Sequence, residues 1–308
     1  MSVSWGIWSY ALPLKRKLAV LGSNQQIRTG FLIGNKRQGE WFFGEAAPLP
    51  SFHKITLKDV FEQLRSWIKD PNLDRLCDLH SVAQFAIQSS LCDYDPSSPI
   101  PINGLCTGAE DLDRRYRSLK LKVGRQSVEE DLQSLSALAA RNLHCSFKLD
   151  ANSLWSFEEV SLFWRGVREH DLVDRVEYIE DPTDDPSKLP ELCDFPLALD
   201  QLLDEEWLSL SALKAIVVKP SLQGGISGVE KWKRKADEHN LSLVLSSTFE
   251  TSIGIGRIAQ LADPNTVHGL GTLRWFSEDI CTPIKHRGDL LFPHQSPPKL
   301  FKSAQREQ

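Results

Sequence analysis

The feature that most constrains the fold is a regular alternation of apolar, strand-like runs with intervening segments after Pro101. The runs are centred near eight positions, Ile102, Leu121, Leu149, Ile179, Leu199, Val218, Leu245 and Leu270. Successive centres are 19 to 30 residues apart, which leaves room for one helix and its loops in each interval. Eight strands that alternate with helices predict a (β/α) barrel. Because no G-x-G-x-x-G fingerprint follows an early strand, an open doubly wound sheet is the weaker alternative.

Helix start signals lie inside three of these intervals. The pattern S-x-x-E, in which the serine and the glutamate cap each other's backbone, occurs at residues 127–130, 156–159 and 227–230. We therefore expect a helix to begin at each of the three serines.

The first part of the chain has a different character from the alternating part. Residues 3–10 and 26–43 are rich in β-branched and aromatic side chains, and a turn is expected at Gly34-Asn35. These segments predict antiparallel strands. Helices are expected at residues 57–68 and 82–92, so this part reads as a small α+β domain.

A short segment rich in proline and serine divides the chain into two parts. Thr56 is a candidate N-cap for the first helix, and residues 95–99 (DPSSP) mark a boundary after the second. We expect an N-terminal α+β domain over residues 1–96 and a barrel over residues 97–278. The tail, residues 279–308, contains four prolines and is expected to pack back on the first domain.

Composition excludes several classes of protein. With 308 residues, 41% apolar and 25% charged side chains, the chain matches folded globular proteins, and its net charge of -5 argues against nucleic-acid binding. No run approaches the roughly 18 apolar residues of a membrane span, and no secretory signal is evident, so we expect no membrane span and a cytoplasmic location. Six cysteines without a C-x-x-C pair are expected to be reduced and mostly buried.

A pair of lysines lies in the second strand of the predicted barrel. Lys120 and Lys122 are two residues apart, so in a strand both point to one face while Leu119 and Leu121 point to the other. If the leucines face the helices, the two ammonium groups face the barrel interior. The alternative is a half-exposed edge strand with lysines in solvent, which is the commoner outcome for an isolated K-x-K because lysine is rarely buried.

The next runs end in charged residues. Three consecutive strands finish with Asp150, Glu180 and Asp200, and the following one finishes with Lys219. In a closed barrel these strand ends converge. Three carboxylates in a low-dielectric site cannot all stay ionised without a cation. A hard divalent ion fits oxygen ligands, which favours Mg²⁺, with Mn²⁺ as a substitute.

This combination of strand-terminal residues resembles the enolase superfamily, and within it the muconate-lactonizing subgroup. Nearly the whole chain is similar to the o-succinylbenzoate synthases of that subgroup. Residues 44–50 (GEAAPLP) resemble the capping-domain segment that closes over the site. Residues 246–254 (SSTFETSIG) and 268–272 (HGLGT) resemble the motifs of the seventh and eighth strands. The resemblance implies an α/β fold, a modified (β/α)8 TIM-type barrel with an N-terminal α+β capping domain.

The resemblance also implies roles for the charged residues. It implies that the three acids at the strand ends, Asp150, Glu180 and Asp200, bind Mg²⁺. It implies that Lys122 removes the proton α to a substrate carboxylate and that Lys219 lies on the opposite face of the substrate. Both are the expected catalytic residues, and burial with neighbouring positive charge should lower the pKa of Lys122.

Substrate contacts follow from the same resemblance. Lys120 is expected to hold the substrate carboxylate, and Ser246 and Gly269 to hold a succinyl group. Two positions depart from the family pattern: Lys148 stands where relatives have arginine, and Gly271 where aspartate is commoner. Lys148 lacks the bidentate fork of arginine, so contact with a succinyl carboxylate would be looser.

Asn152 follows the first of the three strand-terminal acids by two residues. It is expected either to orient Asp150 or a lysine from behind, or to satisfy loop backbone, and both interpretations stay open.

The implied activity is Mg²⁺-dependent dehydration. The substrate would be 2-succinyl-6-hydroxy-2,4-cyclohexadiene-1-carboxylate, converted to o-succinylbenzoate by syn elimination through an enediolate, in menaquinone or phylloquinone biosynthesis. Two alternatives are an N-acylamino-acid racemase or dipeptide epimerase of the same subgroup, and a non-catalytic barrel scaffold. The expected partner is a small-molecule carboxylate, with the protein a monomer or weak homo-oligomer.

Overall fold

The computed structural model describes residues 4–20, 23–50, 52–94, 98–106 and 116–307. A four-stranded antiparallel sheet comes first, in the order β14-β1-β2-β3. Its strands are β1 (Ser4–Val20), β2 (Ser23–Arg37), β3 (Glu40–Ala46) and β14 (Gln305–Arg306). The antiparallel strands predicted for this region are confirmed.

The predicted turn at Gly34-Asn35 is wrong. Both residues lie inside β2, where Gly34 pairs with Gly6 on one side and Phe43 on the other. The chain turns instead at Gln38 and Gly39, whose φ angles of 50° and 90° are in the left-handed region that glycine tolerates.

Helices cover one face of this sheet. They are α1 (Leu57–Lys69), the 3-10 helix η1 (Leu73–Asp78) and α2 (Ser81–Leu91). Both predicted helices are confirmed. The predicted Thr56 N-cap is confirmed too, because the Thr56 hydroxyl accepts from the Asp59 N–H at 3.1 Å. A buried apolar cluster including Ile33, Val60 and Leu64 joins the helices to the sheet.

The central sheet contains seven parallel strands in chain order. They are β5 (Gly104–Cys106), β6 (Ser118–Lys122), β7 (Ser146–Asp150), β8 (Val176–Glu180), β9 (Leu197–Leu199), β10 (Leu213–Val218) and β11 (Ser242–Leu245). Isolated parallel bridges from His268 to Ile102 and from Gly269 to Ser246 link the two edges. The fold is therefore a modified (β/α)8 barrel, as predicted.

The eighth predicted strand, near Leu270, is reduced to these two bridges. Leu270 itself precedes the 3-10 helix η5 (Gly271–Trp275), and its ψ of 10° is not extended. The closing segment is short because His268 and Gly269 already complete the hydrogen bonds to both neighbours.

Among the residues that the structure describes, four α-helices of the barrel part pack against its strands. They are α3 (Val128–Arg141), α4 (Phe157–Glu169), α5 (Gly225–Glu238) and α6 (Ser252–Leu261). The capping boxes predicted at Ser127 and Ser156 are confirmed. The third is wrong, because α5 begins at Gly225 behind Gly224, whose φ of 83° starts the helix before Ser227. No helix among the described residues is long and apolar enough to span a membrane.

The shortest intervals hold 3-10 turns where α-helices were expected. These are η3 (Pro186–Glu191) between β8 and β9, and η4 (Glu205–Trp207) between β9 and β10; η2 (Val173–Arg175) also precedes β8. Pro190 stands inside η3, where its missing N–H prevents a longer helix. Residues 107–115, in the first interval, lie outside the described part of the chain.

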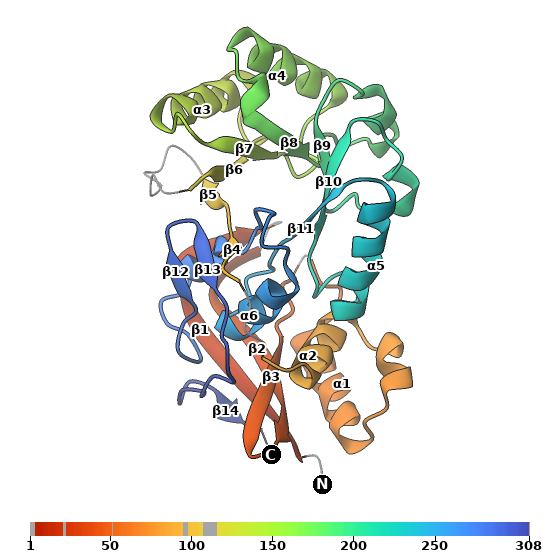
Figure 1. The fold of residues 1–308 in the computed structure, drawn as a ribbon, viewed down its shortest axis with the longest axis vertical. Coiled ribbons are helices and arrows are strands. Elements are labelled where there is room, and N and C mark those ends of the chain that lie inside the picture. The colour runs from red at the N-terminus through yellow and green to blue at the C-terminus, as the bar shows by residue number, and fades with distance from the viewer. Residues whose placement is uncertain (1–3, 21–22, 51, 95–97, 107–115, 308) are drawn as a thin grey trace.

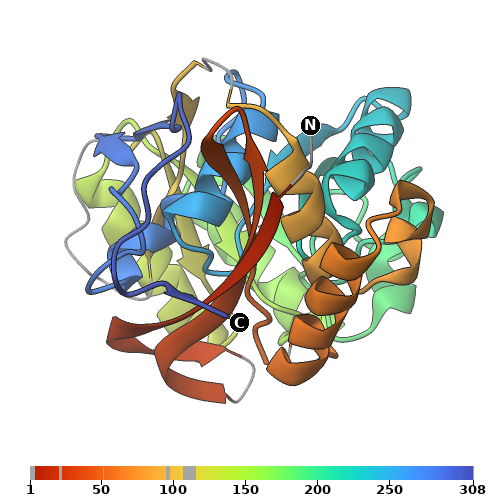
Figure 2. The same ribbon diagram turned by 90° about the horizontal axis from the view of Figure 1, so that it is seen from below.

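The C-terminal tail returns to the beginning of the chain. β12 (Lys285–Arg287) and β13 (Leu290–Phe292) form a small antiparallel sheet with β4 (Ile100–Pro101). β14 pairs with β1, so both described ends of the chain lie beside the antiparallel sheet, at one end of the molecule (Figure 1). The β1–β2 hairpin runs between this tail and α1 (Figure 2). The expected domain boundary, between residues 96 and 97, lies outside the described residues, and the domain division stays a prediction.

All six cysteines are free thiols. Cys106, Cys145 and Cys281 are buried, and Cys92 is partly buried. Cys77 and Cys193 are exposed. The expectation that most would be buried therefore holds for half of them.

Glu45 joins the antiparallel sheet to the barrel. Its carboxylate, fully buried at the end of β3, accepts from the Thr251 hydroxyl at 2.6 Å and from the backbone N–H groups of Thr251 and Gly254 at 3.0 and 2.9 Å. These donors surround the N-terminus of α6, where negative charge is favourable. Tyr10 donates a further hydrogen bond. The GEAAPLP segment is thus fixed to the segment that precedes α6.

Arg28 makes a second connection between the same segments. Its buried guanidinium donates to the carbonyls of Ala47 and Pro48 after β3, and to those of Thr248 and Phe249 after β11. The two sequence motifs at residues 44–50 and 246–254 therefore lie against each other.

Burial raises the pKa of Glu45 to about 7, although hydrogen bonds from Thr251 and Tyr10 lower it. Because the folded protein then binds the Glu45 proton more tightly than the unfolded chain, this contribution to stability is complete below pH 4.5 and is lost as the pH rises through about 7. We predict that Glu45→Gln removes a fall of about 3 kcal/mol in unfolding free energy between pH 5 and 8. Urea unfolding of both proteins across this range measures the difference; identical slopes would contradict the assignment.

Candidate active site

The lysine pair of β6 faces the barrel interior. Leu119 and Leu121, which alternate with it, are buried in the core between the strands and the helices. β6 pairs with β5 on one side and β7 on the other, so it is not an edge strand and the solvent-facing alternative for Lys120 and Lys122 is wrong.

An ion-pair cluster forms where β6, β7 and β8 end. The strand register places Lys122 beside Asp150, and Asp150 beside Glu180. The Lys120 Nζ lies 2.8 Å from Asp150 Oδ2 and 2.7 Å from Glu180 Oε2. The Lys122 Nζ lies 2.6 Å from the same Asp150 oxygen. Two strand-terminal acids are therefore held on one ammonium group.

Lys219 and Asp200 form a neighbouring buried ion pair between the ends of β9 and β10. The Phe52 ring, from the loop after β3, lies with its centroid 5.4 Å from the Lys219 Nζ, within cation–π distance. Sequence reasoning missed Phe52, and its one signal was its place two residues after the GEAAPLP segment. The antiparallel part of the molecule thus reaches the ends of the barrel strands.

The pKa values of the two β6 lysines move in opposite directions. Burial and the charge of Lys120 lower the pKa of Lys122, against the attraction of Asp150. For Lys120, burial alone would lower the pKa, but the charges of Asp150, Glu180 and Asp200 outweigh it and the pKa lies well above its ordinary value. Lys122 therefore loses its proton more readily than Lys120, and the lowered pKa of Lys122 agrees with the direction expected from the sequence.

The acids of the cluster also differ from one another. Burial would raise the pKa of Asp150, but Lys120 and Lys122 outweigh it and hold that pKa below its ordinary value. Burial raises the pKa of Glu180 to about 8, with the Lys120 charge opposing and Asp150 adding to it. Glu180 therefore takes up a proton more readily than Asp150 does.

The donor set suits a hard divalent cation. Asp150, Glu180 and Asp200 offer only carboxylate oxygens, the ligand type that Mg²⁺ prefers. Within the described ranges, however, no three acidic, histidine or cysteine side chains are already grouped for a metal ion. Ammonium groups lie against these carboxylates, so a divalent cation would take over the position that positive charge holds here. The residues fit the ion in chemistry and in strand position.

Asn152 contacts both sides of the cluster. Its Nδ2 donates to Asp150 Oδ1, and its Oδ1 accepts from the Lys122 Nζ at 3.2 Å and from Gln201 Nε2 at 3.4 Å. Its φ of 50° is left-handed, a conformation that asparagine tolerates. Of the two expected interpretations, this geometry matches the one in which Asn152 orients Asp150 and a lysine.

Asp181 is a buried acid that sequence reasoning missed. It follows Glu180 directly, and its carboxylate accepts from the backbone N–H groups of Asp200 and Gln201 at 3.0 and 2.7 Å. Burial, reinforced by the charge of Asp200, raises the pKa of Asp181 to about 6. The sequence does show two adjacent acids, Glu180 and Asp181, before Pro182. Sequence reasoning takes only the first of them as the acid that ends the strand.

Lys148 lies apart from the cluster, in the floor of the barrel. Its Nζ donates to the Val267 carbonyl at 2.6 Å and lies 3.7 Å from Glu177, which also accepts from the hydroxyls of Ser118 and Ser146. The polar contacts of Lys148 are thus with Val267 and Glu177, and its expected roles, behind the acids or toward a succinyl carboxylate, stay predictions.

Ser246 and Gly269 are adjacent where the barrel closes. The Ser246 hydroxyl donates to the Gly269 carbonyl at 3.4 Å, and a Cβ at Gly269 would lie 2.7 Å from that hydroxyl oxygen. A larger residue would therefore displace Ser246. Gly271 begins η5, beside the Asn103 carbonyl. The substrate-binding roles of Ser246 and Gly269 stay predictions.

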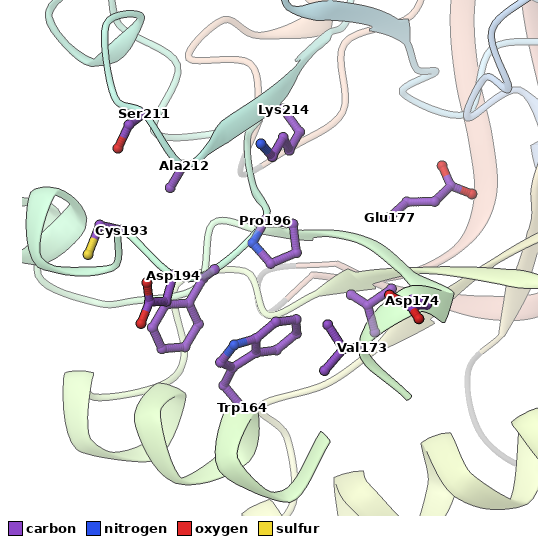
Figure 3. Close-up of a pocket in the computed structure, with 12 residues that line it drawn as sticks. Trp164, Val173, Asp174, Glu177, Cys193, Asp194, Pro196, Ser211, Ala212 and Lys214 are labelled. Carbon is purple, nitrogen blue, oxygen red and sulfur yellow. The ribbon is translucent and has the colours of Figure 1, made fainter. Parts of the chain in front are cut away.

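A cavity of about 430 Å³ lies at the other end of the barrel strands (Figure 3). Its lining includes Val176, which begins β8, and Pro196 and Ala212, which precede β9 and β10. Trp164 and Lys214 lie on opposite sides of the cavity (Figure 3). Because the acids lie at the carboxyl ends of these strands, this cavity is separate from the candidate active site.

Two family profiles match the chain. That of the enolase C-terminal domain-like family covers residues 106–286, and that of the MenC N-terminal domain covers residues 3–90. Among curated relatives, the o-succinylbenzoate synthase of Yersinia enterocolitica is 28% identical over 87% of this chain and 89% of its own. That of Vibrio cholerae is 29% identical over 90% and 91%. The resemblance inferred from the sequence is confirmed.

Solved structures share the fold. The L-Ala-D/L-Glu epimerase of Bacillus subtilis has a TM-score of 0.82 at 18% identity, covering 99% of both chains. The o-succinylbenzoate synthase of Thermosynechococcus elongatus, complexed with Mg in its active site, has a TM-score of 0.73 at 23% identity, covering 91% of this chain and 95% of its own. These similarities confirm the predicted fold class.

We predict that Lys148→Met lowers the free energy of unfolding by about 1–3 kcal/mol, because it leaves the Val267 carbonyl without its donor and Glu177 without its ion pair. Chemical denaturation measures this change. Lys188→Met is the matched control: its ion pair with Glu191 is exposed and should not alter stability. Equal stability of Lys148→Met and wild type would show that the floor ion pair contributes nothing.

Proposed function

The chain belongs to the enolase C-terminal domain-like family, whose profile matches more than half of it, and from this premise we propose that it is a dehydratase that forms o-succinylbenzoate. The proposed substrate is 2-succinyl-6-hydroxy-2,4-cyclohexadiene-1-carboxylate, an intermediate of menaquinone or phylloquinone biosynthesis. The observation that carries the proposal is the buried cluster of three acids with a lysine on each flank, Lys122 and Lys219. The names of the curated relatives support the same activity.

In this proposal Asp150, Glu180 and Asp200 hold Mg²⁺. When bound, the ion would supply positive charge for the substrate carboxylate as negative charge develops on its oxygens. Oxygen donors, burial and the position of the acids at adjacent strand ends support the assignment. Mn²⁺ has the same ligand preference and is expected to substitute.

Lys122 acts as the base. Its neutral amine takes the proton from the carbon next to the substrate carboxylate, and the electron pair of that C–H bond moves onto the carboxylate to give an enediolate. The lowered pKa of Lys122 supports this role. Lys120, whose pKa is raised, stays charged and stabilises the developing negative charge. Asn152 keeps the Lys122 amine in place through its Oδ1.

The same lysine completes the reaction. The enediolate electron pair forms the new ring double bond and breaks the C–O bond of the hydroxyl, which takes the proton from the Lys122 ammonium and leaves as water. Base and acid are then one group on one face, so the elimination is syn. Lys219, with Phe52 beside it, places a cation on the other face of the ring. Its charge would stabilise the electron-rich ring.

A racemase or epimerase of the same subgroup is the second candidate. Lysines on both flanks, Lys122 and Lys219, are what a two-base exchange of the α proton requires. Solvent deuterium exchange at the α carbon of N-succinylamino acids, compared with water loss from the cyclohexadiene substrate, separates the two activities. Rapid exchange without dehydration would reverse the assignment, and neither activity would favour a scaffold.

We predict that Lys122→Ala lowers kcat by roughly 10²–10⁴-fold, the usual contribution of a positioned base, and leaves the fold intact because Lys120 still pairs with Asp150. The decrease in substrate absorbance measures turnover, and circular dichroism checks the fold. Lys214→Ala, an exposed lysine of β10, is the control and should retain full activity. Turnover retained by Lys122→Ala would exclude it as the base.

We predict that Asp200→Asn weakens Mg²⁺ binding more than about tenfold, because a neutral amide oxygen replaces a charged ligand. Titration calorimetry with MgCl₂ measures the affinity. Asp204→Asn provides the matched control, since Asp204 is an exposed N-cap of η4 four residues further on. If Asp200→Asn and wild type bind Mg²⁺ equally, the assignment of Asp200 is wrong.

A further inference from the structure

Asp181 is a buried acid that the proposed reaction does not use. Its side chain is 1% exposed, and the ion pairs found among the described residues do not include it. A buried carboxylate without a cation must be stabilised by hydrogen bonds. Three backbone N–H groups supply them: Asp200 at 3.0 Å, Gln201 at 2.7 Å and Leu202 at 3.4 Å.

These donors belong to the segment that carries a proposed metal ligand. β9 ends at Leu199, so Asp200 and the residues after it lie beyond the strand. Asp181 satisfies three successive N–H groups there, which fixes the direction in which the backbone leaves β9. Since Asp200 is the first of the three, the position of its Cα depends on Asp181.

The backbone of Asp181 connects two further strand ends. Its N–H donates to the Ala198 carbonyl of β9 at 3.1 Å, and its carbonyl accepts from the Ser153 N–H, after β7, at 2.8 Å. Its φ of 44° is left-handed, which is uncommon for a residue other than glycine. One residue therefore links the ends of β7, β8 and β9, the three strands that carry the proposed ligands.

We propose that Asp181 is a positioning residue that fixes Asp200, relative to Asp150 and Glu180, in the geometry that Mg²⁺ requires. The inference rests on the proposed function, because it assumes that these acids bind the ion. It assigns Asp181 no direct contact with the metal. Its effect should be specific for Mg²⁺, which demands near-octahedral geometry, whereas Ca²⁺ accepts irregular arrangements of oxygen ligands.

The test compares Mg²⁺ and Ca²⁺ binding by titration calorimetry in wild type, Asp181→Asn and Asp181→Ser. In the Asn variant an NH₂ group replaces one of the two carboxylate oxygens, so it faces backbone N–H groups that need an acceptor. In the Ser variant a single hydroxyl oxygen is left as acceptor. Both variants should bind Mg²⁺ roughly 10–100-fold more weakly, as outer partners of metal ligands typically do, with a smaller loss for Ca²⁺. Asp185→Asn is the matched control, since the exposed Asp185 caps the Ser187 N–H in the same way.

The outcomes are distinguishable. Unchanged Mg²⁺ affinity in both variants overturns the inference. Equal losses for the two ions also overturn it, because they would reflect the missing negative charge and not geometry. If Asp200→Asn, measured in parallel, keeps full Mg²⁺ affinity, the proposed function fails first.

A measurement on the wild-type protein covers the case in which neither variant folds. The amide hydrogens of Asp200 and Gln201 should exchange with solvent deuterium far more slowly than that of the exposed Glu205, because Asp181 accepts their hydrogen bonds. Rapid exchange at Asp200 and Gln201 would show that Asp181 does not hold this segment.

Discussion

Mutual repulsion among buried carboxylates is the constraint on which the rest of this structure depends. Asp150, Glu180, Asp181 and Asp200 end or follow three adjacent strands and are all nearly inaccessible to solvent. In a low-dielectric interior such a group is stable only if positive charge or hydrogen-bond donors reach every member. Lysines from the two flanking strands meet three of these acids, and backbone N–H groups meet the fourth. The chemistry proposed for the site uses the same charges, because groups that neutralise carboxylates can also stabilise an enediolate.

The antiparallel sheet contributes by closing this end of the barrel. Glu45 and Arg28 are themselves buried charges, and each is satisfied by groups on both sides of the junction between the sheet and the barrel. Their hydrogen bonds hold the loop that brings Phe52 to Lys219. The antiparallel part thereby contributes an aromatic ring to the end of the barrel where the acids lie. The resemblance of both segments to family motifs therefore has a physical basis: each satisfies the buried charges of the other.

Local rules predicted much of the fold, and each of their failures has a physical cause. Two-residue alternation correctly put both β6 lysines on one face, and the pairing of β6 on both sides decided that this face is the interior. The capping boxes at Ser127 and Ser156 were correct because Ser and Glu satisfy each other's backbone. The box at Ser227 failed because two left-handed glycines start α5 earlier. The strand near Leu270 failed because two bridged residues are enough to close the barrel. The first of these failures has its cause next to Ser227 in the sequence, whereas the second depends on pairing with segments far away in the chain.

The sequence by itself determined which residue types end each barrel strand, and hence that acids flanked by lysines meet at one end, because parallel strands share a carboxyl edge. The tertiary structure alone decided how each charge is satisfied. It turned Lys148 to Glu177 in the floor and gave Asp181 the N–H groups after β9. It also brought Phe52, from the loop after β3, to Lys219. These outcomes depend on hydrogen bonds and contacts between segments far apart in the chain, for which neither periodicity nor spacing carries a signal.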